Sequence, residues 1–251
     1  MGTEIIAKGV FAESFATEYA PVVGRGLQAI HFLNSSITKA AHNYARGGVD
    51  AQIAGTPAEA ANRIGFKSLS NYLQSSVPES EEMTIFAVIR SGDTLEDAAH
   101  SPVVCGSRQN NIGGAQMFFQ PAAGNFQFLA DFWTDAAHTS ALPRNVSLIN
   151  VTEIDLSNWS LLVAQARVDR VSIANMTTGA SRESSIQSFG RRVPDSTFRI
   201  GSAWPTTTAY AGSVEMAFIQ MHSAALSPTE ISETATDIRR YLATLPTPIT
   251  V

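Results

Sequence analysis

Apolar and polar residues alternate over many short segments of this chain, with the two-residue period of β-strands. The clearest case lies near the C-terminus. There, residues 198–200 alternate before Gly201, and Val214, Met216 and Phe218 alternate after a Pro/Thr-rich turn. We expect two antiparallel strands in this region, with Val214, Met216 and Phe218 on one buried face.

A helical period replaces the strand period in the segment that follows. Ser227 is placed to cap a helix, Pro228 suits its first position, and Glu230 completes a capping box. The next apolar residues recur at three- and four-residue steps and form one helical face: Ile231, Ala235, Ile238, Leu242 and Leu245. The pattern therefore predicts a short C-terminal helix that packs on the strands.

Strand patterns also recur at regular intervals upstream. Residues 27–34 predict the first strand, and residues 83–91 are apolar on both faces, which predicts a central strand. Residues 126–133 predict a hairpin strand with one aromatic face, whereas residues 35–62 are typical of a long irregular loop. About ten strands, no repeats and one terminal helix predict an all-β fold, an antiparallel β-sandwich.

The domain organisation follows from the same pattern. Residues 1–26 carry few periodic apolar positions, so we interpret them as an N-terminal arm that either lies loosely or reaches a neighbouring molecule. Residues 27–251 contain no stretch with the composition of a linker and predict a single β-sandwich domain.

The C-terminal segment FRIGS…YAGSVEMAFIQMHSAALSPTEI resembles the C-terminal signature of concanavalin A-like (laminin G-type) jelly-roll domains. In that signature a strand ends in Ile-Gly, a G-x-[IV]-[DE] strand follows, and a Leu-Ser pair opens a short helix. The resemblance implies a concanavalin A-like jelly roll. The segments LQAIHFLNSS, AQIAGTPA and MTIFAVIRS are also similar to small laminin G-type proteins of tailed bacteriophages, which are tail, fibre or decoration components.

Composition narrows the range of partners. The net charge is −5 and charged residues make up 16% of the chain, so no basic field favours nucleic acid. No apolar stretch approaches the length of a membrane span, and the N-terminus lacks the pattern of a signal peptide, so we expect synthesis in a cytoplasm. The single cysteine, Cys105, predicts a small buried apolar residue.

The strongest enzymatic hypothesis concerns the segment NVTEIDLSNW. Retaining glucanases with a jelly-roll fold carry E-x-D-x-x-E, in which two glutamates act as nucleophile and acid/base. Glu153 and Asp155 match this pattern, but Asn158 replaces the second glutamate and has no ionisable proton to give. Trp159 resembles the start of a laminin G-type strand, which makes the preceding residues a turn. We therefore predict no catalytic residues.

Metal sites are not favoured by the sequence. Asp93, Glu96 and Asp97 form a polar loop with carboxylate oxygens, but the Asp/Asn alternation of a dedicated calcium loop is missing, so a solvated loop is the favoured interpretation. The histidines are scattered, and His31 is interpreted as a satisfied histidine within a sheet. We predict no metal and no cofactor. The pair Arg191–Arg192 is interpreted as surface charge.

Carbohydrate binding needs an exposed aromatic platform with polar groups beside it. Trp204, Tyr210 and Trp133 are the candidates, and Trp204 and Tyr210 share the loop between the last two strands. The alternative for each ring is ordinary packing under a loop.

Three classes of function remain. The first is a non-enzymatic virion structural protein with a lectin-like fold that contacts host surface glycans. Its partners would be further copies of itself or other virion proteins, reached through residues 1–26. The alternatives are an isolated carbohydrate-binding module and a glycoside hydrolase of jelly-roll fold. The absence of a catalytic set, the lysine-poor composition and the phage resemblance favour the first class.

Overall fold

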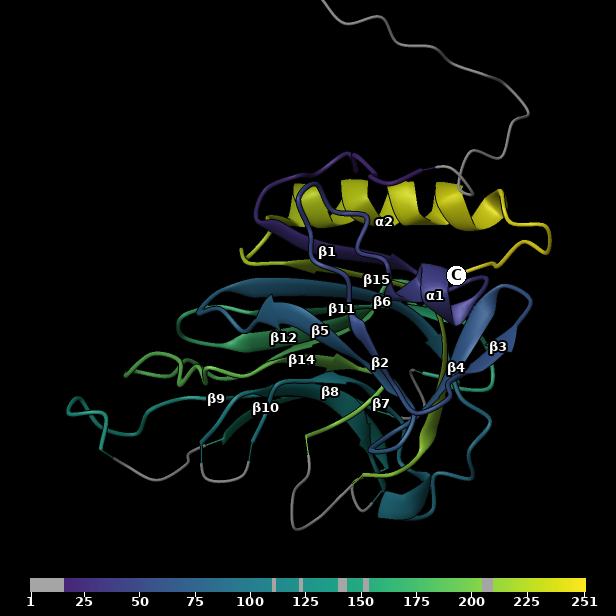
Figure 1. The fold of residues 1–251 in the computed structure, drawn as a ribbon. Helices are drawn as coiled ribbons and strands as arrows, with labels where there is room; N and C mark the ends of the chain where they lie inside the picture. Colours follow the sequence, from purple (N-terminus) through teal and green to yellow (C-terminus); the bar gives the residue numbers. More distant parts are fainter. Residues whose placement is uncertain (1–15, 110–111, 122–123, 140–143, 151–153, 205–209) are drawn as a thin grey trace, which may run out of the picture.

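The computed structural model describes residues 16–109, 112–121, 124–139, 144–150, 154–204 and 210–251. Within them, two antiparallel sheets stack face to face (Figure 1). The eight-stranded sheet has the order β13 (Ala180–Glu183), β12 (Val171–Asn175), β11 (Ser160–Ala166), β6 (Met83–Arg90), β15 (Ser213–His222), β4 (Arg63–Lys67) and β3 (Ala58–Ala60), with β1 (Leu27–Phe32) also paired to β15. The seven-stranded sheet has the order β10 (Arg144–Asn150), β9 (Asn125–Asp131), β8 (Ala115–Gln120), β7 (Val103–Gly106), β14 (Thr197–Ile200), β5 (Tyr72–Pro78) and β2 (Gln52–Ala54). The predicted antiparallel β-sandwich is confirmed.

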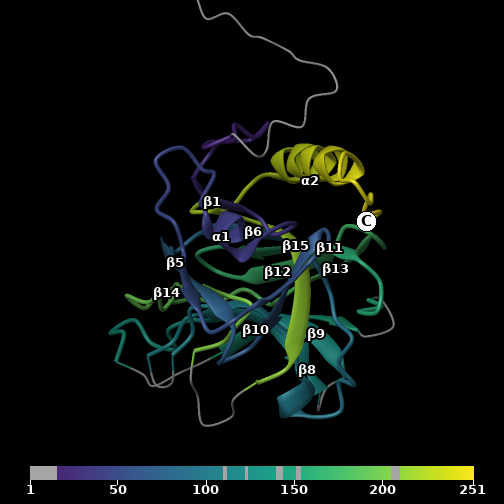
Figure 2. The same cartoon turned by 45° about the vertical axis from the view of Figure 1, so that its right-hand side comes forward.

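The C-terminal helix α2 (Pro228–Ala243) forms where the sequence predicts it. The Ser227 hydroxyl accepts a hydrogen bond from the backbone N–H of Glu230, and the Glu230 carboxylate accepts one from the N–H of Ser227. Its apolar face packs on the outer face of the eight-stranded sheet, with Ile238 and Leu242 buried there (Figures 1 and 2). The outer face of the seven-stranded sheet has no α-helix over it in the described chain.

Strand β15 departs from simple alternation. Val214 and Met216 point into the core between the sheets, but Phe218 points outward to α2, so the prediction that all three share a face is wrong. The cause is a β-bulge between Met216 and Phe218, which inserts one residue and reverses the side-chain alternation. Ile219 therefore faces the core.

The two C-terminal strands are also not partners of each other. Strand β14 lies between β7 and β5 in the seven-stranded sheet, whereas β15 belongs to the other sheet. Residues 201–212 therefore connect one layer of the sandwich to the other. The pattern of alternation gives strand positions but not pairing, because both neighbours of β14 come from distant segments.

Several short elements lie where the sequence predicts loops. Helix α1 (Ile37–Ala41), β2 and β3 fall within residues 35–62, and β13 falls in the loop before β14. A single turn of 3₁₀-helix spans Ala98–His100. These elements have three to five residues each, which is too short to show a clear period.

Part of the predicted arm lies against its own chain. The Tyr19 hydroxyl donates a hydrogen bond to Asp237 of α2 at 2.9 Å, and its ring meets that of Phe32 edge-on. Arg25 forms an ion pair with Glu230 at 2.7 Å. Residues 1–15 lie outside the described residues, so the division into arm and domain stays a prediction.

Gly201 ends β14 in a left-handed conformation, with φ +79°. A Cβ atom there would lie 2.3 Å from Cγ of Phe66, which belongs to the other sheet. We expect Gly201→Ala to lower the free energy of unfolding by about 2–5 kcal/mol, through backbone strain and overpacking. Gly179 has φ +80° and no heavy atom near its Cβ position, so Gly179→Ala isolates the backbone cost of about 1–2 kcal/mol. Chemical denaturation of both variants measures the difference, and equal losses would contradict the packing argument.

His31 is fully buried in β1, and its Nδ1 lies 3.0 Å from the carbonyl oxygen of Ala40. Burial lowers the pKa of His31 to about 4, against an ordinary value of 6.5. Because the unfolded chain binds a proton first, stability is complete above pH 6.5 and falls as the pH drops towards 4, by about 3 kcal/mol from this residue. Burial also lowers the pKa of His222, which acts in the same direction.

The variant His31→Asn keeps a side-chain donor and removes the titration. We expect its unfolding free energy to fall less steeply than that of the wild type between pH 6.5 and 4. Thermal or urea denaturation across this range measures the slope. Parallel slopes for the two proteins would show that His31 does not carry the pH dependence.

Candidate functional site

Two of the three predicted aromatic residues, Trp204 and Tyr210, lie on the outer face of the seven-stranded sheet. Trp204 follows β14, and Tyr210 lies beyond residues 205–209, which are outside the described residues. The outer face carries a small apolar cluster of Val103, Phe118, Leu129 and Ala203, against which Tyr210 packs. Trp204 and Tyr210 are both half-buried.

Trp204 is held in a fixed position by its polar edge. Its indole Nε1 donates a hydrogen bond to the backbone carbonyl of Thr197 at 3.1 Å. The guanidinium carbon of Arg199 lies 4.0 Å from the centre of the indole. The anchored, half-exposed ring is a flat apolar surface on a rigid strand end.

Arg199 connects Trp204 to the neighbouring strand. In β14, Phe198 and Ile200 are buried in the core, so Arg199 points to the outer face. Its guanidinium carbon lies 4.7 Å from the ring centre of Tyr72 on β5, and Nε donates to the Gln74 carboxamide at 3.1 Å. Removal from water lowers the pKa of Arg199 from its ordinary value.

Polar side chains continue across the same face. The Tyr210 hydroxyl donates to the carboxamide oxygen of Gln120 at 2.5 Å, and its ring lies 4.7 Å from that of Phe118. Strands β8 and β9 contribute further carboxamides to this face, those of Gln116, Asn125 and Gln127. Nε2 of Gln116 is buried and has no hydrogen-bond partner among the described residues. Amides and aromatic rings together are the groups that bind sugars.

Trp133 lies elsewhere. It follows the end of β9, whereas Tyr210 contacts Gln120, which pairs with the first residue of β9. Strand β9 has seven residues, so its two ends lie roughly 20 Å apart. The Trp133 ring stacks on His138 at 5.0 Å and contacts the Arg192 guanidinium at 4.6 Å. The register therefore separates Trp133 from Tyr210 along the strands, and the sheet order places β9 three strands away from β14, which precedes Trp204.

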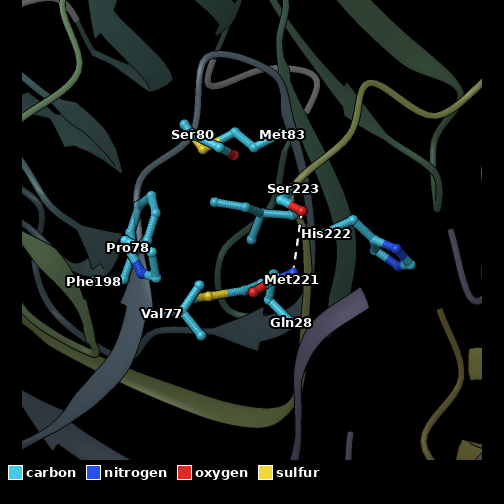
Figure 3. Close-up of a pocket in the computed structure, with 10 residues that line it drawn as sticks. Gln28, Val77, Pro78, Ser80, Met83, Phe198, Met221, His222 and Ser223 are labelled. Carbon is cyan, nitrogen blue, oxygen red and sulfur yellow. Dashed lines mark hydrogen bonds between the residues drawn. The ribbon is translucent and has the colours of Figure 1, made fainter. Parts of the chain in front are cut away.

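A pocket at the margin between the two sheets is too small for a sugar (Figure 3). Its volume is about 10 Å³, which is room for one water molecule. A hydrogen bond of 3.1 Å between Gln28 and Ser223 crosses its rim. The lining is mostly apolar and includes Val77, Met83, Phe198 and Met221.

The described part of the glucanase-like segment, residues 154–159, contains a turn and no strand. Glu153 lies outside the described residues. Asp155 is exposed and accepts hydrogen bonds from the Ser157 hydroxyl at 2.6 Å and the Asn158 amide at 2.7 Å. These bonds lower the pKa of Asp155. The residues before Trp159 make the expected turn before β11.

A second pair of carboxylates is enclosed in the protein. Glu79 is fully buried and accepts hydrogen bonds from Arg191 and from the Ser107 hydroxyl and the Ala115 N–H. Burial raises the pKa of Glu79, and the positive charge of Arg191 opposes that rise. Asp131 is also buried and forms an ion pair with Arg108 at 3.1 Å. The interpretation of Arg191 as surface charge is therefore wrong.

The described residues contain no group of three or more His, Cys, Asp or Glu side chains placed to hold a metal ion. In the acidic loop that contains Asp93, Glu96 and Asp97, Asp97 caps the 3₁₀ turn and pairs with His100, and Asp93 accepts a hydrogen bond from the Ser213 N–H. Cys105 is buried as predicted, and burial raises the pKa of its thiol. No helix in the described chain has both the length and the apolar content of a membrane span.

No protein-family model matches the chain, and no curated protein does. Similar solved structures include the receptor-binding domain of botulinum neurotoxin D, at 12% identity and a TM-score of 0.58, with 86% of this chain and 54% of that chain covered. The ligand-binding domain of botulinum neurotoxin serotype D in complex with N-acetylneuraminic acid has 12% identity and a TM-score of 0.59, with 86% and 52% covered. Trypanosoma rangeli sialidase in complex with sialic acid has 15% identity and a TM-score of 0.57, with 85% and 33% covered.

These comparisons establish the fold. The chain spans about half the length of the neurotoxin domains and a third of the sialidase, so the ligands named for them belong to those larger proteins. The sandwich architecture is thus shared with proteins that bind sialic acid.

Proposed function

We propose that this protein is a non-enzymatic carbohydrate-binding β-sandwich that holds a glycan on the outer face of its seven-stranded sheet. The observation that carries the proposal is the Trp204 ring, which is fixed by its hydrogen bond to Thr197 and half-exposed. A sugar ring presents axial C–H groups that pack on such a flat aromatic surface. The partly exposed carboxamides of Gln74 and Gln120 on the same face supply donors and acceptors for hydroxyl groups.

The non-enzymatic part of the proposal rests on the carboxylates. Among the described residues, Glu79 and Asp131 are enclosed with partners, and Asp155 is engaged in a turn beside Asn158. A glycoside hydrolase needs two carboxyl groups on opposite sides of an accessible bond. The sialic acid named in two of the similar structures makes sialylated glycans the first ligands to test.

The test compares two tryptophans of similar exposure. We expect Trp204→Ala to weaken glycan binding about five- to tenfold, since one stacking contact contributes on the order of 1 kcal/mol. Trp133→Ala is the matched control, because Trp133 follows β9, which is three strands away from β14 in the sheet, and it should bind like the wild type. A glycan array followed by calorimetry measures both. If Trp204→Ala binds glycans normally, or if Trp133→Ala loses binding, the glycan does not bind at Trp204.

We further propose that the protein acts within a virion, as a phage tail, fibre or decoration component that meets host surface glycans. The support is the sequence similarity of residues 27–36, 51–58 and 83–91 to such proteins. In this role, self-association or contact with other virion proteins would use the N-terminal arm.

The contacts of Tyr19 and Arg25 with α2 decide which residues to remove in a test of the arm. Removing residues 1–15 leaves both contacts intact, so the sandwich should keep its thermal stability. We expect the full chain to be an oligomer by light scattering and the shortened chain to dissociate at the same concentration. A monomer in both cases would argue against assembly through the arm.

A further inference from the structure

Arg199 differs from other arginines that lie in or beside the sheets. Arg63 and Arg90 both pair with Glu215, Arg108 pairs with Asp131, and Arg191 pairs with Glu79. Arg199 is half-buried, yet no carboxylate of the described residues lies within ion-pair distance of it. The neighbouring residues 205–209 are Pro-Thr-Thr-Thr-Ala and contain no acidic group.

The contacts that Arg199 does make leave part of the guanidinium without a partner. Nε donates to the Gln74 carboxamide and Nη1 to the Ala203 carbonyl at 3.3 Å. Nη2 has no hydrogen-bond partner in the described chain. Withdrawing a cation from water is unfavourable unless a negative group compensates, and only neutral acceptors do so here.

The two aromatic contacts orient the charge. The guanidinium carbon lies 4.0 Å from the ring centre of Trp204 and 4.7 Å from that of Tyr72. Stacking of this kind fixes the plane of a guanidinium while its edge stays available for hydrogen bonds. An immobilised guanidinium edge matches the two oxygens of a carboxylate and loses little conformational freedom on binding.

We propose that Arg199 binds the carboxylate of an acidic sugar, of the hexuronic or nonulosonic acid class, while the sugar ring packs on the part of Trp204 that the guanidinium does not cover. This inference rests on the proposed glycan-binding function and specifies its ligand class. The charge comes from one residue of β14 and the stacking surface from a residue five positions later, so one strand end supplies both. The carboxylate supplies the negative group that the protein does not place beside Arg199.

The experiment uses the full chain and pairs of oligosaccharides, each acidic glycan beside its carboxyl-reduced counterpart. We expect the wild type to prefer the acidic member, and Arg199→Gln to lose about tenfold or more in affinity for it. Affinity for the neutral member should fall much less, because Trp204 keeps its hydrogen bond to Thr197. Arg199→Lys keeps the positive charge but lacks the two parallel N–H donors of a guanidinium, so it should retain only part of the preference for the acidic glycan.

Arg182 is the matched control, because it is an exposed arginine on β13 of the other sheet. Arg182→Gln should bind both glycans like the wild type. Thermal unfolding of each variant checks that the fold is intact.

The outcomes separate the two proposals. If the wild type binds acidic and reduced glycans equally, or if Arg199→Gln keeps the preference, the ligand-class inference fails and glycan binding stands. If the wild type binds no glycan at all, both proposals fail. If Arg199→Gln does not fold, the paired-glycan preference of the wild type and its change in Arg199→Lys still decide the question.

Discussion

The structure depends on β15 being buried on both faces and paired on both edges. One edge pairs with β6 over most of its length, and the other pairs first with β4 and then with β1. One face meets the core between the sheets, and the other meets α2. In a regular strand, every second side chain points to the same face. The bulge before Phe218 shifts this alternation by one residue, so that Phe218 points to the face opposite that of Met216. With it, Phe218 contacts the helix, while Ile219 and Met221 complete the core.

The connection between the two sheets positions the candidate site. Gly201 approaches Phe66 of the opposite sheet, and the Ser202 hydroxyl accepts a hydrogen bond from the Leu69 N–H at 2.8 Å. At the other end, the Gly212 N–H donates to the Ser101 carbonyl at 2.9 Å. Trp204 and Tyr210 lie just inside these two anchors. Their positions are therefore set by the crossing between layers, which is an integral part of the sandwich.

Much of the fold is predictable because its strands and its C-terminal helix produce short-range periodic patterns in the sequence. The alternation of residues 126–132, the doubly apolar β6 and the capping box of α2 each need only neighbouring residues to be recognised. The bulge in β15 is not of this kind, because it is defined by the register with β6, which comes from a distant segment. The burial of Arg191 escapes prediction for the same reason, since its partner Glu79 lies 112 positions away in the sequence.

The candidate site is likewise predictable from the sequence only in part. Trp204 and Tyr210 are recognisable as aromatic residues on one connection, but their separation from Trp133 depends on strand direction. Arg199 carries a local signal that is easily missed, because an arginine between buried Phe198 and Ile200 must point to the outer face. Its lack of an acidic partner is visible only once β5 and β7 are known to be its neighbours.

The contrast between Arg191 and Arg199 shows how one fold treats two similar charges. Arg191 is enclosed with Glu79, and breaking that pair would leave a buried charge uncompensated, at a cost of about 3–5 kcal/mol. Arg199 is only half-buried and is held by two rings and two neutral acceptors, so the fold tolerates its incomplete compensation. The first arrangement leaves neither side chain accessible to a ligand. The second keeps one hydrogen-bonding edge available, and a charge that the fold leaves uncompensated at its surface is suited to bind an anion from outside.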